Sequence, residues 1–199
     1  MRRKHSEITD PQEIERILSS TNVGRLATIG ADGCPYITPV NFVWHGGKIY
    51  FHSAPAGEKL DNLARNAKVC FEVDIPLAYL DTGCDPERRT CRVHQLYHCV
   101  IVRGKARAVP DGQPKVAALN ALVAKHEGGS DFEPVNQDMP AYKGCVVVEI
   151  EPTLISAKSD LFQNRTDEER LAIAKYLKAR NRPTDLATVR AMGFDPDPI

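Results

Sequence analysis

Residues 25–53 read RLATIGADGCPYITPVNFVWHGGKIYFHS, and this stretch decides the fold. Short runs rich in apolar and β-branched residues at Arg25–Ile29, Tyr36–Trp44 and Lys48–Ser53 are separated by an Asp-Gly turn and a Gly-Gly turn. Turns of this kind join strands that lie side by side and run in opposite directions. The stretch therefore predicts three successive strands of an antiparallel meander.

The rest of the chain adds strands and helices around this meander. Further strands are predicted at Val69–Val73, Tyr97–Val109 and Cys145–Ile150. Helices are predicted after the Asp10 N-cap, at Leu60–Arg65 and at Lys115–His126. Six short strands with interspersed helices predict a mainly β protein whose antiparallel sheet closes into a barrel, because closure leaves no unpaired edge.

Two segments stand apart from the predicted barrel. Residues Ile75–Leu96 are polar and rich in turn residues, and they predict a long loop of the kind that is often functional or mobile. The tail is predicted to be helical from the capping box at Thr166 to about Ala179, and again from Thr184 to Met192. We expect a barrel domain over residues 1–160 and a helical C-terminal extension over residues 161–199, docked on the barrel or on a second subunit.

The charge balance disfavours two classes of partner. The 199 residues include 26 basic and 26 acidic side chains, so no net field attracts nucleic acid or a membrane surface. No apolar run approaches the roughly 18 residues of a membrane span, and no apolar segment follows the basic N-terminus, so we expect a cytoplasmic protein. Six cysteines without a secretory signal are expected to be free thiols.

An anion site is predicted at residues 51–63, FHSAPAGEKLDNL, where a strand passes through a Pro/Gly turn into a helix. Free N–H groups at a helix N-terminus carry partial positive charge, and Lys59 adds a full charge there. A phosphate-bearing ligand fits this arrangement, although many such junctions use Gly and Lys simply to make a soluble turn. The chain has no P-loop and no G-x-G-x-x-G after a strand, which disfavours ATP and dinucleotides.

Several motifs together resemble one known family. They are GRLATI at residues 24–29, DGCPYITPVNF at 32–42, IYFHSA at 49–54, KLDNL at 59–63 and VIVRGKA at 100–106. In this order, within about Ile8 to Lys158, they resemble the pyridoxamine 5′-phosphate oxidase-like FMN-binding split barrels, in particular the nitroimidazole-resistance (Nim) branch. The resemblance implies a six-stranded, antiparallel, Greek-key-type split barrel with flanking helices. It also implies a homodimer that binds FMN between its subunits.

The same resemblance implies the residues that contact the cofactor. The strand Thr38, Pro39, Val40 and Asn41 would run along the isoalloxazine ring, with Asn41 available as a hydrogen-bonding side chain. The ribityl chain and phosphate would be flanked by Phe51, His52 and Ser53, and the phosphate would pair with Lys59. His98 and Cys99 match a strand position that also reaches FMN in the family, with a contact across the dimer as one arrangement.

The chain also departs from the true pyridoxamine phosphate oxidases. Glu58 and Val43 stand where those enzymes carry a phosphate-binding arginine and lysine, and no R-L-x-P substrate motif ends the chain. Fewer cations around the phosphate predict weaker FMN binding. Together the departures disfavour pyridoxamine phosphate as the substrate.

His52 is the candidate catalytic residue. An imidazole beside a flavin can donate a hydrogen bond or a proton to a substrate during reduction. Contact with the phosphate or the ribityl chain is the alternative role, because the flavin itself carries the hydride chemistry.

A metal site is not predicted, although five potential ligands fall within sixteen residues: Cys84, Cys91, His94, His98 and Cys99. They include no C-x-x-C pair, and the neighbours His98 and Cys99 point to opposite faces of a strand. Cys70 and Cys145 lie in apolar strands and are expected in the core.

The resemblance and the residues together predict an FMN-binding, homodimeric oxidoreductase. It would pass electrons from a reduced nicotinamide, NAD(P)H, to a small electrophile such as a nitro-aromatic. Two alternatives stay open: a split barrel that binds haem through a histidine at 52, 94 or 98, and a non-catalytic flavin-binding or sensor protein whose tail covers the ring. The sequence names neither the physiological substrate nor the electron donor.

Overall fold

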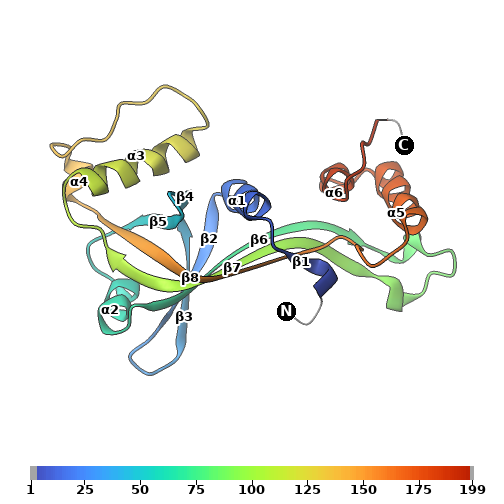
Figure 1. The fold of residues 1–199 in the computed structure, drawn as a ribbon, viewed down its shortest axis with the longest axis horizontal. Coiled ribbons are helices and arrows are strands. Elements are labelled where there is room, and N and C mark those ends of the chain that lie inside the picture. Colours follow the sequence, from blue (N-terminus) through green and yellow to red (C-terminus); the bar gives the residue numbers. More distant parts are fainter. Residues whose placement is uncertain (1–3, 198–199) are drawn as a thin grey trace. The chain divides into compact units, whose positions relative to one another are not determined.

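A computed structural model describes residues 4–197 as a mainly antiparallel β protein that also contains several helices (Figure 1). The strands are β1 (Glu7–Ile8), β2 (Val23–Ile29), β3 (Pro35–Asn41), β4 (Val43–His45), β5 (Lys48–Ser53), β6 (Lys68–Leu80), β7 (His94–Ala108) and β8 (Val146–Asp160). Hydrogen-bonded neighbours follow the order β3-β2-β6-β7-β8-β5-β4, and β1 pairs with β8. The predicted fold class is confirmed.

The helices are α1 (Pro11–Ser19), α2 (Glu58–Arg65), α3 (Gln113–Glu127), α4 (Pro140–Lys143), α5 (Asp167–Arg180) and α6 (Asp185–Ala191). Short 3-10 turns lie at Lys4–Ser6, Thr82–Cys84 and Thr90–Arg92. The side chains that sequence analysis assigned as N-caps act as such. Asp10 accepts from the Gln12 N–H at 3.0 Å, and Thr166 and Glu169 form a reciprocal capping box.

Strand number and sheet closure differ from the prediction. Eight strands replace six, partly because the run Tyr36–Trp44 is broken at Phe42 into β3 and β4. The Phe42 side chain is fully buried, and its ring packs edge-on against that of Phe71, with 5.0 Å between the centroids. In the described part of the chain the path of paired strands is open, ending at β3 and β4.

The chain divides into two compact units. The larger contains Asp10–Val73 and Val100–Ser156, and the smaller contains Asp74–Cys99, the segment from Ala157 onward and the residues before Asp10. Three strands, β6, β7 and β8, pass from one unit into the other. The predicted boundary near residue 160 stays a prediction.

In the larger unit, α3 covers one part of the sheet with an apolar cluster. Its buried members are Val43, Val109, Ala118, Leu119, Leu122, Tyr142 and Val147. Burial of this many aliphatic side chains fixes α3 and α4 against β4, β5 and β8. These contacts form one wall of the candidate site described below.

In the smaller unit, the predicted loop Ile75–Leu96 is shorter than expected. β6 continues to Leu80 and β7 begins at His94, so the connection that remains is 81–93. The reason is packing: Leu77, Leu80 and Leu96 share a buried cluster with Ala174 and Leu177 of α5. Both ends of the predicted loop are therefore strands, because they pack against apolar residues about a hundred positions away in the sequence.

Candidate functional site

A pocket in the larger unit brings together two of the predicted site residues, Asn41 and His52. They stand at the ends of β3 and β5, both side chains are exposed, and both line a cavity of about 380 Å³. Cavities of this size hold small organic ligands. The pocket thus places one amide and one imidazole at a common apolar surface.

The rest of the lining comes from α3, α4, the segment between them and Cys145, which follows α4. Its apolar members are Leu119, Leu122, Val123, Val135, Met139 and Ala141, and its polar members are His126, Glu127, Tyr142 and Cys145. The Nε2 atom of His126 is buried and has no hydrogen-bond partner among the described residues. A buried, unpartnered imidazole nitrogen at a pocket wall is a ready donor or acceptor for a bound molecule.

Hydrogen bonds hold this wall in place. Asn120 accepts from the Val135 N–H at 2.8 Å and donates to the Val135 carbonyl at 3.0 Å, which fixes the segment before α4 to α3. The Gly112 N–H donates to the Tyr142 hydroxyl at 2.7 Å, and the Lys115 ammonium lies 4.3 Å from the centre of the Tyr142 ring. The wall is therefore shaped before any ligand arrives.

Sequence reasoning missed this wall. Leu119, Leu122 and Tyr142 look like ordinary core residues, and Cys145 was expected to be core. Cys145 is instead half-buried and lines the pocket, with its Sγ 3.7 Å from the Tyr142 carbonyl oxygen. No spacing or motif in the sequence marks these residues as binding residues.

Ser53 follows His52 along β5 and carries the feature that best fits a phosphate. Its side chain is 5% exposed, and its Oγ is buried without a hydrogen-bond partner among the described residues. A buried hydroxyl left unpaired costs about 1–3 kcal/mol. A hydrogen bond from the Ser53 hydroxyl to a ligand oxygen would remove this cost, and the resemblance to the FMN-binding split barrels implies such a contact at this position.

Helix α2 begins five residues after Ser53. Its N-cap is Gly57, with φ of 134° and no side-chain capping bond, and a Cβ there would meet open space. The first N–H groups of the helix are therefore not covered by a capping side chain. Lys59, the second helical residue, is half-buried and makes no ion pair with any described residue. These groups fit a bound phosphate.

The buried Asn62 anchors α2 to the sheet. Its side chain is fully buried and donates to Thr28 Oγ1 of β2 at 3.0 Å, and it also accepts from Arg65. The hydrogen bond holds the helix N-terminus at a fixed place relative to β2. A preorganised anion site needs this kind of support.

The strand predicted to follow the flavin ring has one open edge. β3 pairs with β2, with Thr38 opposite Leu26 and Val40 opposite Gly24, and it ends the path of strands that the structure describes. Backbone groups on the outer edge are therefore available, which the predicted contacts require. Along the strand, Thr38 is half-buried, Pro39 exposed and Val40 buried.

The remaining predicted residues lie elsewhere. Phe51 is fully buried in the core of the larger unit. His98 and Cys99 belong to the smaller unit, where His98 is 4% exposed and its Nδ1 lies 2.7 Å from Ser159 Oγ. Their contact with a cofactor stays a prediction, as do the roles of Phe51 and Lys59.

Two further features bear on the class of protein. Among residues 4–197 no three His, Cys, Asp or Glu side chains are grouped so that they could hold a metal ion. In the same range, none of the helices combines the length and the apolar character that crossing a membrane requires.

Comparison with known proteins places the chain in a family. A family model described as pyridoxamine 5′-phosphate oxidase matches residues 10–159. A 5a,11a-dehydrotetracycline/5a,11a-dehydrooxytetracycline reductase from Streptomyces rimosus is 33% identical over 100 residues, which cover 48% of this chain and 61% of the relative. The match thus spans less than two thirds of that enzyme's length.

Three solved structures share the fold. A candidate 5-nitroimidazole antibiotic resistance protein from Bacteroides thetaiotaomicron has a TM-score of 0.65 at 24% identity, covering 77% of this chain and 86% of its own. The flavocytochrome Anf3 from Azotobacter vinelandii has a TM-score of 0.66 at 21% identity, and the match covers 86% of this chain and 77% of Anf3. An FAD- and haem-binding protein from Mycobacterium smegmatis has a TM-score of 0.67 at 17% identity, and the match covers 84% of this chain and 80% of that protein.

These structural likenesses establish the fold, and the family model spans more than half of the chain. The match includes β2 to β5, the start of α2 and the pocket wall of α3 and α4. The chain belongs to the pyridoxamine 5′-phosphate oxidase family of flavin-binding split-barrel oxidoreductases.

Proposed function

We propose that this protein is an FMN-dependent reductase that passes electrons from a reduced nicotinamide to a small electrophile such as a nitro-aromatic. The observation that carries the proposal is the succession of His52 at the pocket and Ser53 with its unpartnered, buried hydroxyl. Because neighbours on a strand face opposite sides, His52 would contact a molecule in the pocket, and Ser53, which does not line that pocket, would contact the phosphate from the other side of β5. Reductase activity in the Streptomyces relative supports the reaction class.

The phosphate would be held at Ser53 and the start of α2. Ser53 Oγ donates to a phosphate oxygen, and the uncapped N–H groups after Gly57 and the Lys59 ammonium supply positive potential. Glu58 places a carboxylate in the same turn, which reduces that potential. FMN binding is therefore expected to be weaker than in a site with several arginines and lysines.

The substrate would enter the pocket of about 380 Å³. Its walls are mainly apolar, and its cation count is low, which suits a flat, uncharged aromatic molecule and not a phosphorylated amine. Asn41 can hydrogen-bond the polar edge of the flavin ring, while the His126 Nε2 and the Tyr142 side chain face the pocket from the other wall.

Flavin supplies hydride transfer when bound, and the protein supplies position and proton control. His52 is exposed at the pocket and can donate a hydrogen bond or a proton to the atom being reduced. If His52 acts in this way, His52→Gln lowers kcat and leaves the Kd for FMN unchanged. If His52 contacts only phosphate or ribityl groups, the Kd for FMN changes and kcat at saturating FMN stays the same.

We further propose that the active form is a homodimer. Asn41 and His52 are both exposed, so a flavin seated against them from one subunit keeps another face open to water. A second copy of the chain would cover that face and exclude water from the reaction. Light scattering of the purified protein, with and without FMN, measures the subunit number.

The first experiment is a visible spectrum of protein purified without added cofactor, followed by release and identification of the chromophore. Flavin bands with FMN released support the proposal, and turnover of a nitro-aromatic with NADH or NADPH then tests the reaction. A Soret band would instead assign a haem protein. Bound FMN without turnover by either donor would leave a flavin-binding sensor, and failure to bind added FMN would overturn the proposal.

Ser53→Ala gives a sharper prediction, because two effects have opposite signs. Removing an unpaired buried hydroxyl leaves the free energy of unfolding of the apo-protein unchanged or raises it by up to about 1 kcal/mol. The same change removes a donor to phosphate and weakens FMN binding about tenfold or more. Chemical denaturation and fluorescence titration measure the two quantities. Ser19→Ala, an exposed serine on α1, is the control and changes neither.

A further inference from the structure

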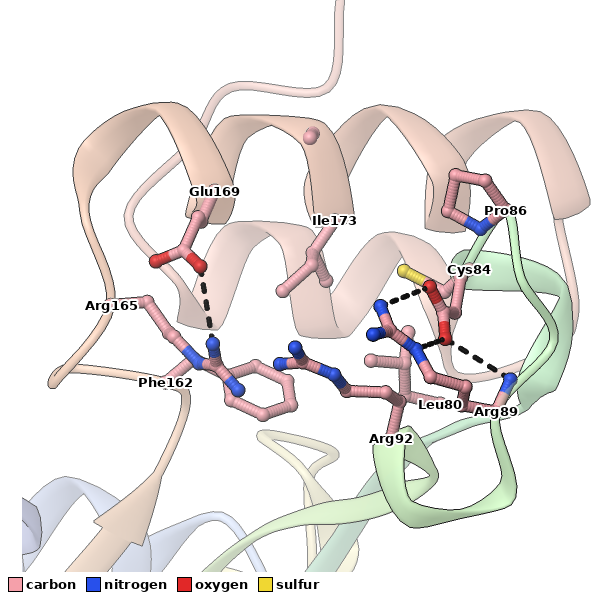
Figure 2. A pocket seen from close by; sticks show the side chains of 11 residues that line it. Leu80, Cys84, Pro86, Arg89, Arg92, Phe162, Arg165, Glu169 and Ile173 are labelled. Atoms are coloured by element: carbon pink, nitrogen blue, oxygen red, sulfur yellow. Dashed lines mark hydrogen bonds and ion pairs between the residues drawn. The ribbon is translucent and has the colours of Figure 1, made fainter.

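A second pocket lies in the smaller unit, between the 81–93 connection and helix α5 (Figure 2). Its volume is about 320 Å³, and three arginines line it: Arg89, Arg92 and Arg165. The same lining includes Asp85 and Glu169. All of these residues belong to the smaller unit, so the pocket is separate from the Asn41 and His52 site.

Two of the three arginines are already neutralised. Arg89 makes a two-pronged ion pair with Asp85, at 2.7 Å and 3.0 Å, and Asp85 also accepts from the Arg89 N–H at 3.0 Å. This pairing lowers the pKa of the Asp85 carboxyl well below its usual range. Arg165 donates to Glu169 Oε1 at 3.1 Å. Both pairs are drawn in Figure 2.

Arg92 is different. Its side chain makes no ion pair or hydrogen bond with any residue in the described range. Arg92 is the last residue of the 3-10 turn Thr90–Arg92, and it lines the pocket. In Figure 2 its guanidinium points along the pocket floor, between Arg165 and Arg89. Among the lining residues, Arg92 is the one arginine without an ion pair in the described range, whereas Arg89 has a second acidic partner, Glu87, at 3.2 Å outside the lining.

The rest of the lining is apolar. Leu80 is 4% exposed, Phe162 is 9% exposed, and Ala172 and Ile173 of α5 complete the wall. Burial raises the pKa of the Cys84 thiol, with the nearby Asp81 carboxylate adding to the effect, so this group stays neutral at pH 7. A ligand here meets one cation at one end and a hydrocarbon surface along its body.

Phe162 is held in place by its surroundings. Its φ is 59°, a left-handed conformation that a bulky residue rarely adopts without tertiary support, and its ring lies 5.0 Å from that of His94. The apolar wall is therefore rigid. Rigid walls reduce the entropic cost of binding a small molecule.

We propose that this pocket binds a small organic monoanion, a carboxylate with an apolar body, through a charge-assisted pair with Arg92 and contact with Phe162 and Ile173. A guanidinium matches the two oxygens of a carboxylate with parallel hydrogen bonds. A multiply charged phosphate is disfavoured, because the lining offers one arginine without an ion pair and also contains the Asp85 and Glu169 carboxylates.

The test uses the full chain and three probes: benzoate, its uncharged analogue benzamide, and inorganic phosphate. Calorimetry is expected to detect benzoate binding at millimolar concentration and neither of the other two. Amide chemical shifts are expected to change at Phe162 and Ile173. No benzoate binding, equal binding of benzamide or of phosphate, or shifts confined to the Asn41 and His52 pocket would each overturn the proposal.

Three variants place the binding. Arg92→Gln is expected to weaken benzoate binding about tenfold or more, since charge-assisted hydrogen bonds of this kind contribute strongly. Arg190→Gln removes one positive charge from α6 in the same unit, outside the pocket, and is expected to leave the Kd unchanged. Ala172→Phe fills the pocket and is expected to abolish binding while Arg92 remains. Equal effects of Arg92→Gln and Arg190→Gln would mean attraction to overall charge, which overturns the assigned site.

Discussion

Lys125 of α3 is the most unusual single charge of the larger unit. Its ammonium lies 3.8 Å from the centre of the Phe42 ring and donates to the Leu18 carbonyl at 3.2 Å. Burial nevertheless lowers the pKa of Lys125 to about 8, because these partners replace the lost hydration incompletely. At neutral pH the protein therefore carries a charge that its surroundings disfavour.

This charge predicts a pH-dependent stability difference. Below pH 8 Lys125 is protonated in both the folded and unfolded chain and the burial penalty is fully present. Between the folded pKa of about 8 and the ordinary value of 10.5, the unfolded chain binds more protons, so this group makes the free energy of unfolding rise with pH. We expect Lys125→Met to be the more stable protein at pH 7, with an advantage that shrinks toward pH 10. Urea denaturation at several pH values measures it, and an advantage independent of pH would contradict the explanation.

At the scale of elements, one arginine joins two helices to a strand. Arg180 of α5 donates to Asp185 of α6 at 2.6 Å and 2.9 Å, to Asp81 at 3.1 Å and to the Tyr79 carbonyl of β6 at 2.9 Å. Asp185 is fully buried. Burial alone would raise the pKa of Asp185, but the Arg180 guanidinium and the Arg182 N–H outweigh it and lower that pKa.

Removing this arginine leaves a buried carboxylate without its charged partner, because the Arg182 N–H alone remains. We expect Arg180→Met to lower the free energy of unfolding by about 3–5 kcal/mol. Arg182→Met is the matched control, because Arg182 also pairs with Asp81, at 2.9 Å, but its side chain is 56% exposed, and its loss should cost no more than about 1 kcal/mol. Equal losses in the two variants would mean that burial of the pair is not what matters.

Strand β8 leaves no room for a side chain at Gly104 of β7. A Cβ at this position would overlap the Glu151 carbonyl oxygen, a backbone atom that cannot rotate away. We expect Gly104→Ala to cost about 1–3 kcal/mol, the usual price of forcing backbone shifts in a packed region. Gly144→Ala, at the end of α4, places its Cβ 3.2 Å from the Pro140 carbonyl oxygen and should change the midpoint of thermal unfolding much less.

The elements show what a sequence can and cannot predict. The strand Lys48–Ser53 is confirmed to the residue, because a Gly-Gly turn bounds it on one side and a Pro/Gly turn on the other. The end of β6 is predicted as loop, because Ile75–Leu96 is polar and rich in turn residues and the partners of Leu77 and Leu80 lie in α5 and α6. The local sequence pattern predicts a strand correctly when turn residues next to it set its ends. The prediction fails when packing against distant parts of the chain sets those ends.

The candidate site divides in the same way. Asn41 and His52 were predicted from a resemblance and do share a pocket. The facing wall of Tyr142 and His126 was not predicted, because aromatic and apolar residues on a helix look alike whether they line a cavity or fill a core. Flavin contacts of Lys59, His98 and Cys99 remain predictions for the spectrum and the binding titrations to test.

At the scale of the whole molecule, the C-terminal helices cover the apolar surface of the smaller unit. Leu77, Ala78, Leu80 and Leu96 are buried in a cluster that α5 and α6 complete. A chain ending at Asp160 would expose these side chains. We expect this truncated protein to aggregate or to bind a hydrophobic dye strongly, whereas the full chain does not. A soluble truncated protein with the thermal midpoint of the full chain would instead support an independent domain over residues 1–160.

The alternating burial along strand β7 limits which insertions and deletions this protein can tolerate during evolution. From Leu96 to Ala106 every second residue is buried, and the run continues without interruption from the smaller unit into the larger. Inserting or deleting one residue would exchange inner and outer faces for everything beyond it. Gene variants that alter length by one codon should therefore survive in the 81–93 connection and be purged from β7, and a deep insertion–deletion scan with a folding reporter would display that boundary.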